Sequence, residues 1–457
     1  MNYFLAVDIG ASSGRHILGH LEQGKLILQE IYRFENNITS QNGNLIWDIE
    51  HLESEVKQGI QECGKLGITP ATVAIDTWAV DYVLIDENGK EILPALSYRD
   101  PRTAGIPEKI DEILPREALY ARNGIQPLNF NTIYQLYCDK QSGKLTKAAR
   151  LLMIPEYLSY KLTGVMKNEY TNATTGAFVH CNTRQKDEEL LAMLGIPSHL
   201  VGELSLPGTV VGNFSDEVKE QVGFDATVIL CPSHDTASAV AACPIGENGV
   251  YISSGTWSLI GTELANPITT PDALHGGFTN EGGILYRYRF LKNIMGMWLF
   301  QNIRRNLDKK YSYDEMMQMA MESNYTTPIN PNAPEFVAPE NMVEAIRTYL
   351  GEPNLPLGDV LSSVYHSLAL SYKEAVETIE TLTGKTVDVI NIIGGGSKDA
   401  YLNRLTKQYT GKRVLAGPTE ATATGNLIAQ LMFDNPALTL EQARQMIKES
   451  FELTEVE

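Results

Sequence analysis

Residues 8–15, Asp-Ile-Gly-Ala-Ser-Ser-Gly-Arg, follow a short apolar run and combine small side chains with two hydroxyls and one guanidinium. Small residues let consecutive backbone amides approach an anion, and Ser12, Ser13 and Arg15 add donors for phosphate oxygens. Asp8 carries the carboxylate that a hydrated Mg²⁺ prefers. The segment matches neither the P-loop pattern nor the Rossmann fingerprint. It predicts a phosphate-binding turn, and the alternative is a plain β-turn with a solvated arginine.

Two later segments repeat this chemistry in the second half of the chain. Residues 253–258, Ser-Ser-Gly-Thr-Trp-Ser, form another small, hydroxyl-rich turn between strand-like runs. Residues 394–397, Gly-Gly-Gly-Ser, stand between an apolar run and a helical pattern, where bare backbone and a helix N-terminus suit a flat or anionic ligand. We expect the turns at 8–15 and 253–258 to hold one polyphosphate from two sides. The alternatives are an ordinary hairpin and a tight strand-to-helix turn.

Asp235 stands where a strand-like run, 226–231, gives way to small residues suited to a close-packed helix. A carboxylate at such a junction can accept the proton of a sugar hydroxyl while that oxygen attacks phosphorus. The alternative is that Asp235 only caps the helix. Its neighbour His234 is, taken alone, as well explained by hydrogen-bonded packing as by catalysis.

Residues 76–81, Asp-Thr-Trp-Ala-Val-Asp, place carboxylates on both sides of an indole, and 98–103 add two arginines. Charged groups bind sugar hydroxyls, and the C–H face of a sugar rests on an aromatic ring. This pattern predicts a sugar site at Asp76 and Trp78. Core packing is the alternative for Trp78.

The elements that must position these residues alternate between strands and helices, which predicts an α/β protein. A strand, a small-residue turn and a second strand open the chain, and the same order recurs after residues 244–249, Pro-Ile-Gly-Glu-Asn-Gly. Pro and two Gly within six residues predict a hinge there, and the repeat predicts two halves. Apolar spacing predicts helices over 51–66, 291–304 and 358–382.

The whole chain has 457 residues, 43% hydrophobic and 20% charged, as expected of a globular protein. Its net charge of −19 argues against nucleic acid and anionic membranes as partners. Five cysteines without CxxC spacing predict reduced thiols. The first residues lack the pattern of a signal peptide and no long apolar run follows, so we expect a cytoplasmic location without a membrane span.

Ten motifs in this order give the sequence a resemblance to the FGGY carbohydrate kinases, and within that family to the rhamnulokinases. The resemblance extends from Ala6 to about Ala429. The motifs are DIGASSGR, IDTWAVD, YRDPRT, FNTIYQL, EYTNATT, SHDTASAV, YISSGTWSL, TNEGG, LKNIMGMWLFQ and GGGSKDAYLNRL.

The resemblance implies two actin-like ATPase domains of ribonuclease-H-like α/β fold with a cleft between them. Residues 1–245 would bind sugar and phosphate, and residues 246–457 would bind the nucleotide. It implies that Asp235 is the proton acceptor and that Asp8 organises Mg²⁺. The implied ATP contacts are Ala11, Ser12, Ser13, Gly14, Arg15, Thr256, Gln301 and Gly396. The implied sugar contacts are Ala79, His234, Thr236 and Asn293.

The activity that the resemblance implies is transfer of the γ-phosphoryl group of ATP to the C1 hydroxyl of L-rhamnulose, by a monomer or a homodimer. One departure matters: the family motif usually has glycine where this chain has Ala79. A methyl group takes space from a pocket and alters discrimination between substrates. A kinase for another ketose, such as L-fuculose or a pentulose, therefore stays open. A catalytically idle sugar or nucleotide sensor on the same fold is the alternative from a different class.

Overall fold

The computed structural model describes residues 2–457. The chain forms two compact units, and each is assembled from separate stretches of sequence. The first unit holds the chain up to Ala242, Leu264–Phe290 and Thr422–Ser450. The second holds Cys243–Glu263, Leu291–Ala421 and Phe451–Glu457.

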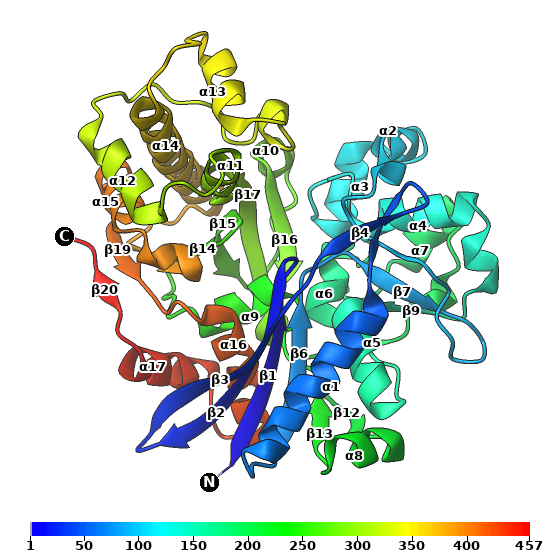
Figure 1. Cartoon of the computed structure of the whole chain (residues 1–457). Coiled ribbons are helices and arrows are strands. Elements are labelled where there is room, and N and C mark those ends of the chain that lie inside the picture. The colour runs from blue at the N-terminus through cyan, green and yellow to red at the C-terminus, as the bar shows by residue number, and fades with distance from the viewer. Residues whose placement is uncertain (1) are drawn as a thin grey trace. The chain divides into compact units, whose positions relative to one another are not determined.

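The first unit combines a six-stranded sheet with smaller sheets and helices (Figure 1). Its strands are β1 (Tyr3–Ile9), β2 (Ser13–Glu22), β3 (Lys25–Glu35), β4 (Ile38–Gln41), β5 (Asn44–Trp47), β6 (Thr72–Thr77), β7 (Tyr82–Ile85), β8 (Ala95–Leu96), β9 (Arg150–Met153), β10 (Asn168–Glu169), β11 (Leu204–Ser205), β12 (Val210–Asn213), β13 (Thr227–Ile229) and β16 (Phe278–Gly282). Its helices are α1 (Ile49–Lys65), α2 (Ile106–Asp111), α3 (Arg116–Asn123), α4 (Thr132–Gln141), α5 (Ile154–Thr163), α6 (Tyr170–Thr175), α7 (Glu188–Leu194), α8 (Asp216–Val222), α9 (Asp235–Ala242), α10 (Pro271–His275), α16 (Ala421–Asp434) and α17 (Leu440–Ser450).

The six-stranded sheet has the order β12-β13-β6-β1-β2-β3. β1 runs parallel to β6 and antiparallel to β2, so the predicted N-terminal hairpin is confirmed. β13 is also parallel to β6. The carboxyl ends of β1, β6 and β13 therefore lie at the same edge of the sheet. The carboxyl ends of parallel strands are where α/β folds place ligands.

Helix α1 packs on this sheet because its apolar residues recur every three or four positions. The predicted helix over 51–66 is confirmed, with bounds Ile49–Lys65. Asp48 caps it, since its carboxylate accepts a hydrogen bond of 2.9 Å from the backbone N–H of His51. The predicted apolar face is buried and consists of Leu52, Val56, Ile60 and Cys63.

Helix α16 comes from the end of the chain yet belongs to the first unit. Gln430 donates to the carbonyl of Leu5 in β1 at 3.0 Å and accepts from the hydroxyl of Thr72 in β6 at 2.6 Å. A side chain at Gly425 would overlap the carbonyl of Ser238 in α9, so the two helices touch through bare backbone. The segment Thr422–Ser450 therefore completes the interior of the first unit.

The second unit is built around β14 (Gly249–Ser254) and β18 (Val389–Ile393), which pair in parallel. β15 pairs with β14 in an antiparallel hairpin, as the repeat predicts. Its other strands are β15 (Trp257–Leu264), β19 (Arg413–Ala416), β20 (Thr454–Glu455) and the larger part of β17 (Tyr288–Met295). Its helices are α11 (Trp298–Asn306), α12 (Tyr313–Glu322), α13 (Met342–Leu350), α14 (Leu357–Thr383) and α15 (Ala400–Thr410).

The predicted helix over 291–304 is wrong in its first half. Residues up to Met295 continue the strand β17 (Tyr288–Met295), and the helix α11 begins only at Trp298. Gly296 separates them in a position where a side chain would overlap Ser258. The helix predicted over 358–382 is confirmed as α14, Leu357–Thr383.

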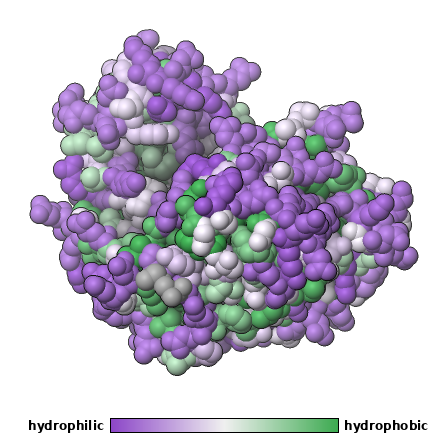
Figure 2. Space-filling view, turned by 60° about the horizontal axis from the view of Figure 1, so that its bottom comes forward, coloured by the Kyte–Doolittle hydropathy of each residue, from purple (hydrophilic) through white to green (hydrophobic). Residues whose placement is uncertain are grey.

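The face in Figure 2 is dominated by hydrophilic residues, with hydrophobic residues showing between them toward its middle. All five cysteines are free thiols, as predicted. Within residues 2–457, no helix combines the length and the apolar character that a membrane crossing requires.

Candidate functional site

Three aspartates gather at the carboxyl ends of neighbouring strands in the first unit. Asp8 in β1 stands opposite Asp76 in β6 in the parallel register. The chain leaving β13 comes alongside the end of β6, where the N–H of Thr77 donates to the carbonyl of Ser233 at 2.9 Å. Asp235 follows two residues later. Sequence reasoning assigned these carboxylates to different tasks, and the fold brings them to one edge.

The turn after β1 is stabilised by its own backbone and by a buried asparagine. The N–H of Gly10 donates to the carbonyl of Ser13 at 2.9 Å, and Asn36 donates from its side chain to the carbonyl of Gly10 at 2.9 Å. Gly14 lies on the ring of Phe34, which a side chain at this position would overlap. In this turn Ala11 and Ser13 are half-buried and Ser12 is exposed.

Arg15 forms an ion pair with Asp8 at the start of β2. Its Nε and Nη2 both donate to Asp8 Oδ2, at 3.1 and 2.9 Å. The carboxylate of Asp8 is buried, whereas the guanidinium keeps 22% of its surface exposed. The predicted phosphate-binding arginine is therefore held beside the predicted metal-binding aspartate.

Asp76 is fully buried beside this pair. Its Oδ2 accepts a hydrogen bond of 2.7 Å from the side chain of Asn426 in α16. Its Oδ1 is buried and finds no hydrogen-bond partner among residues 2–457. Burial raises the pKa of Asp76 well above its ordinary value, and the negative charges of Asp8 and Asp235 add to the increase. The three-aspartate edge therefore holds a buried carboxyl oxygen that lacks a donor among the described residues.

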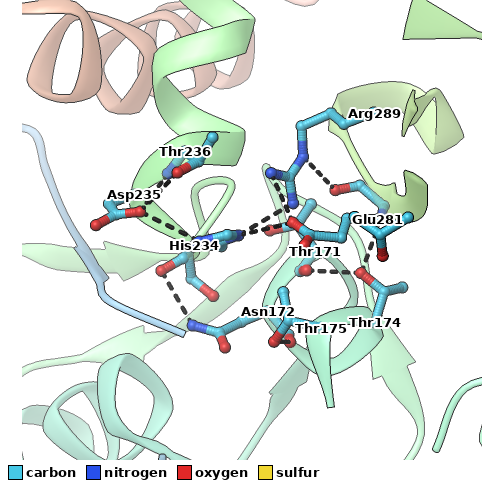
Figure 3. Close-up of polar contacts among 12 residues, drawn as sticks. Thr171, Asn172, Thr174, Thr175, His234, Asp235, Thr236, Glu281 and Arg289 are labelled. Carbon is cyan, nitrogen blue, oxygen red and sulfur yellow. Dashed lines mark hydrogen bonds and ion pairs between the residues drawn. The ribbon is translucent and has the colours of Figure 1, made fainter. Parts of the chain in front are cut away.

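Asp235 begins helix α9, and one of its oxygens receives three donors (Figure 3). Oδ1 lies 2.5 Å from the N–H of Thr236 and 3.0 Å from its hydroxyl, and 3.2 Å from Nε2 of His234. Burial raises the pKa of Asp235, but these donors and the His234 ring outweigh it and lower the pKa below its ordinary value. The carboxylate side chain keeps 31% exposure. Asp235 is thus ionised, oriented and accessible.

His234 and Thr236 are buried on either side of it. On its other edge the imidazole faces Arg289 and Glu281, which Figure 3 shows converging on the ring from β17 and β16. Glu169 fixes the chain just before His234, because its carboxylate accepts from the hydroxyl of Ser233 at 2.6 Å. The motif at 233–236 is therefore held from two directions.

The segment after β6 forms a tight loop around Asp81. Its Oδ2 accepts from the indole N–H groups of Trp47 and Trp78, at 2.6 and 3.0 Å. The two indoles lie 4.1 Å apart between ring centroids, and both are buried. Trp78 therefore packs and hydrogen-bonds within the unit, and Ala79 beside it is half-buried.

In the second unit, the turns at 254–258 and 394–397 lie against each other. A side chain at Gly396 would overlap Ser254 Oγ, so this close approach requires glycine. Ser254 Oγ is itself buried without a hydrogen-bond partner among residues 2–457. Thr256 is half-buried at the tip of the β14–β15 hairpin.

The start of α11 is joined to the same hairpin. The carbonyl of Thr256 accepts from the N–H groups of Gly296 and Trp298, at 3.2 and 3.1 Å. Gln301 follows in the first turn of α11 and is half-buried. Asn293 lies in β17, and its carbonyl accepts from the Asn332 side chain at 3.0 Å. Thr256, Gly396 and Gln301 thus come from three elements connected to one turn.

Sequence reasoning missed the side chains that hold the predicted residues. Asn426 has no local motif and reaches Asp76 across 350 positions of sequence. Glu281 stands in the motif TNEGG, but no role was predicted for it. The only sequence signal for Glu281 was a charged residue among the small residues of its motif.

Comparison with known proteins identifies the family of the chain. The description "FGGY family of carbohydrate kinases" matches residues 3–242 for its N-terminal domain and 250–433 for its C-terminal domain. A rhamnulokinase of Halalkalibacterium halodurans is 46% identical over 99% of this chain and 98% of its own. A rhamnulokinase of Bacillus subtilis is 42% identical over 98% of this chain and 94% of its own.

The fold is that of a solved sugar kinase. The structure of a xylulose kinase from Lactobacillus acidophilus superposes with a TM-score of 0.83, covering 98% of this chain and 92% of that one at 16% identity. The predicted actin-like, ribonuclease-H-like α/β fold is confirmed. The two family domains and the relatives at 46% and 42% identity establish that the chain belongs to the FGGY family of carbohydrate kinases.

Proposed function

We propose that this protein is an ATP-dependent kinase that phosphorylates the C1 hydroxyl of L-rhamnulose, giving L-rhamnulose 1-phosphate and ADP. The observation that carries the proposal is Asp235: an ionised, partly exposed carboxylate whose Oδ1 is occupied by three donors, which leaves Oδ2 to accept a proton. The names of relatives at 46% and 42% identity support the choice of sugar.

The proposed reaction is an in-line displacement at phosphorus. The C1 oxygen of the ketose gives its proton to Asp235 and forms a bond to the γ-phosphorus, while the bond from that phosphorus to the bridging oxygen breaks and ADP leaves. His234 and Thr236 orient the carboxylate through their hydrogen bonds. A well-placed general base of this kind typically contributes about 10²- to 10⁴-fold.

The ATP contacts stay a proposal and come from the turns described above. Arg15 and the backbone of residues 11–14 would bind phosphate oxygens, because a guanidinium and bare amides suit anions. The nucleotide contacts proposed for the second unit are Thr256, Gln301 and Gly396. The unpartnered Ser254 hydroxyl beside Gly396 supports an anion at that turn.

The sugar contacts are proposed for the first unit and one strand of the second. The proposed set is Asp76, Trp78, Ala79, His234, Thr236 and Asn293. Trp78 and Asp76 are buried. We therefore expect both to shape the walls of the pocket, with His234 and Thr236 beside the reacting hydroxyl.

Asp8 is the residue that we propose holds Mg²⁺. Among residues 2–457 no cluster of three or more His, Cys, Asp or Glu has a metal-binding arrangement, but Mg²⁺ in kinases needs only one or two carboxylates and completes its shell with phosphate and water. The orphaned Asp76 oxygen across from Asp8 supports a cation at this edge. When bound, Mg²⁺ would offset the charge of the phosphates.

The decisive experiment replaces the proposed base. Asp235→Asn keeps the size of the side chain and removes its basicity, so we expect kcat to fall by about 10²- to 10⁴-fold with ATP binding and the unfolding midpoint retained. Asp216→Asn, an exposed carboxylate at the start of α8, is the control and should change neither. Turnover of Asp235→Asn close to that of the wild type would refute the assignment.

Ala79 supports one alternative, a kinase for another ketose. ADP release measured with L-rhamnulose, L-fuculose and pentuloses decides between them, because the true substrate gives saturable ATP consumption at the lowest concentration. A catalytically idle sensor would consume ATP with none of these sugars.

We also propose that the functional division of the chain lies at 245/246. We propose a cytoplasmic location as well, which the five free thiols support.

A further inference from the structure

Arg289 and Glu281 form a buried ion pair behind the imidazole of His234. Arg289 has no exposed surface, and the Glu281 side chain has 10%. Arg289 Nη1 lies 3.0 Å from Glu281 Oε2, and its Nε donates to the carbonyl of Gly282 at 2.9 Å. Two of the guanidinium nitrogens are thus directed by hydrogen bonds, Nε to Gly282 and Nη2 to His234, and Nη1 meets Glu281 as an ion pair without a hydrogen bond (Figure 3).

The guanidinium determines which ring nitrogen of His234 carries the proton. Arg289 Nη2 lies 3.1 Å from His234 Nδ1, and a guanidinium can only donate. Nδ1 must therefore accept, which places the proton of the neutral ring on Nε2. That nitrogen lies 3.2 Å from Asp235 Oδ1, so its N–H donates to the carboxylate. With the proton on Nδ1 instead, two donors would face each other and a lone pair would face the carboxylate.

Glu281 has a different effect on the same ring. Its Oε2 lies 3.4 Å from His234 Nδ1 and favours the doubly protonated ring. Burial lowers the pKa of His234, yet the hydrogen bonds to Asp235 and Glu281 outweigh it and raise the pKa above its ordinary value. Arg289 opposes this by its charge. The charged groups that face the imidazole are therefore Asp235, Glu281 and Arg289.

We propose that Arg289, held in place by Glu281, is a positioning residue that keeps His234 in the Nε2–H tautomer and thereby directs Oδ2 of Asp235 toward the substrate. This inference rests on the proposed role of Asp235 as the base. Without the guanidinium, Nδ1 would face only the carboxylate of Glu281, which favours a proton on that nitrogen and competes with Asp235 for the tautomer. In the Nδ1–H form the carboxylate of Asp235 loses one of its three donors.

The closing experiment observes the tautomer and the turnover separately. Nitrogen-15 NMR of histidine-labelled protein at alkaline pH, where the imidazole rings are neutral, resolves the protonated nitrogen of each of the eight histidines, and the signal of His234 is identified by its absence in His234→Gln. We expect the wild type to show His234 protonated on Nε2 only. A wild-type ring protonated on Nδ1 overturns the inference without any variant.

Arg289→Lys then tests the consequence, since a lysine keeps the charge but lacks the fork. We expect His234 to lose the pure Nε2–H pattern and kcat to fall by about 10- to 100-fold, with the KM for ATP unchanged. Arg122→Lys is the matched control, because Arg122 also pairs with a buried carboxylate, Asp187, at 2.8 Å in the same unit without touching His234. Arg289→Gln, which removes the charge and the fork together, serves as the second variant if Arg289→Lys does not fold, with the same expectation.

The two proposals fail differently. A folded Arg289→Lys with the wild-type tautomer and kcat within twofold of wild type overturns the positioning role, whatever Asp235→Asn does. Full turnover of Asp235→Asn refutes the base, even if the tautomer of His234 responds to Arg289 as expected.

Discussion

Val80 adopts a left-handed backbone conformation, with φ of 68°, although it is β-branched and buried. Such a residue persists only when its surroundings determine it, and this kind of strain collects at functional sites. The carbonyl of Val80 accepts from the hydroxyl of Thr132 at 2.7 Å, and Asp81 next to it is held by two indoles. Ala79 is therefore presented by a stiff loop, so its methyl group has little freedom to move aside for a ligand.

Because this loop is stiff, we expect Ala79 to contribute to the discrimination between ketose substrates. Ala79→Gly should change the ratio of kcat/KM values between L-rhamnulose and competing ketoses by a factor that corresponds to about 1–3 kcal/mol. The ratio is measured with the ketose panel in an ADP-release assay. Ala104→Gly, at an exposed position, controls for the flexibility that glycine introduces. An unchanged ratio would place Ala79 outside the pocket.

At this scale, the sequence predicted those residues that stand in motifs. Asp235, His234 and Arg15 each carry a recognisable neighbourhood of small residues and hydroxyls. Asn426 and Arg289 do not, because their relevance comes from where the strand order and α16 place them. No local spacing encodes a contact that spans 350 or 55 positions.

Gly59 allows helix α1 to approach β2. His16 from β2 is fully buried against the helix and donates from Nε2 to the carbonyl of Val56 at 3.1 Å. A side chain at Gly59 would overlap the His16 ring. The contact between helix and strand therefore depends on a missing methyl group in the middle of a helix.

Gly59→Ala should lower the free energy of unfolding by about 1–3 kcal/mol, because overpacking outweighs the better helix propensity of alanine. Urea denaturation measures the effect. Gly64→Ala is the matched control on the same helix, since its new methyl group would meet its nearest neighbour, Phe224, at an ordinary 3.5 Å. That control should be neutral or stabilising. A Gly59→Ala protein as stable as Gly64→Ala would contradict the packing described.

The same histidine makes stability depend on pH. Burial lowers the pKa of His16 from 6.5 to about 4, opposed by its hydrogen bond to Val56. Between these values the unfolded chain binds the proton and the folded protein does not, so stability falls as pH is lowered from 6.5 to 4. The largest contribution is about 3 kcal/mol. The difference in unfolding free energy between wild type and His16→Gln, measured at pH 7 and 4.5, should shrink or reverse at the lower pH. A constant difference would contradict it.

Helices and strands were predictable where a regular apolar spacing continued over many residues. Helix α14 extends over 27 residues, and its apolar spacing fixed both of its ends to within one residue. The stretch 291–295 was not predictable, because Leu, Ile and Met at short intervals suit a helix and a buried strand equally. Pairing within a sheet and the close contact of Gly296 with Ser258 decided it.

The first compact unit closes only with residues from the far end of the chain. Gln430 and Asn426 bind strands β1 and β6, and Arg444 in α17 donates to the carbonyl of Val240 at 2.9 Å. A fragment of residues 1–245 lacks these partners and would leave buried acceptors such as Asp76 without donors.

We therefore expect the 1–245 fragment to show no cooperative unfolding transition by circular dichroism. Co-expression with residues 246–457 should restore the transition, because α16 and α17 are then supplied in a second chain. A fragment that unfolds cooperatively alone would show that the functional division at 245/246 is also a folding boundary.

The return of α16 into the first unit also constrains biosynthesis. A ribosome releases the chain from its N-terminus, and domains generally fold as they emerge. Strands β1 and β6 appear early, but the helix that satisfies them ends at Asp434 of 457 residues. Residues up to Gln430 must therefore be translated before Gln430 and Asn426 can bind β1 and β6, so these contacts form late in synthesis, whereas α1 can pack on the sheet early.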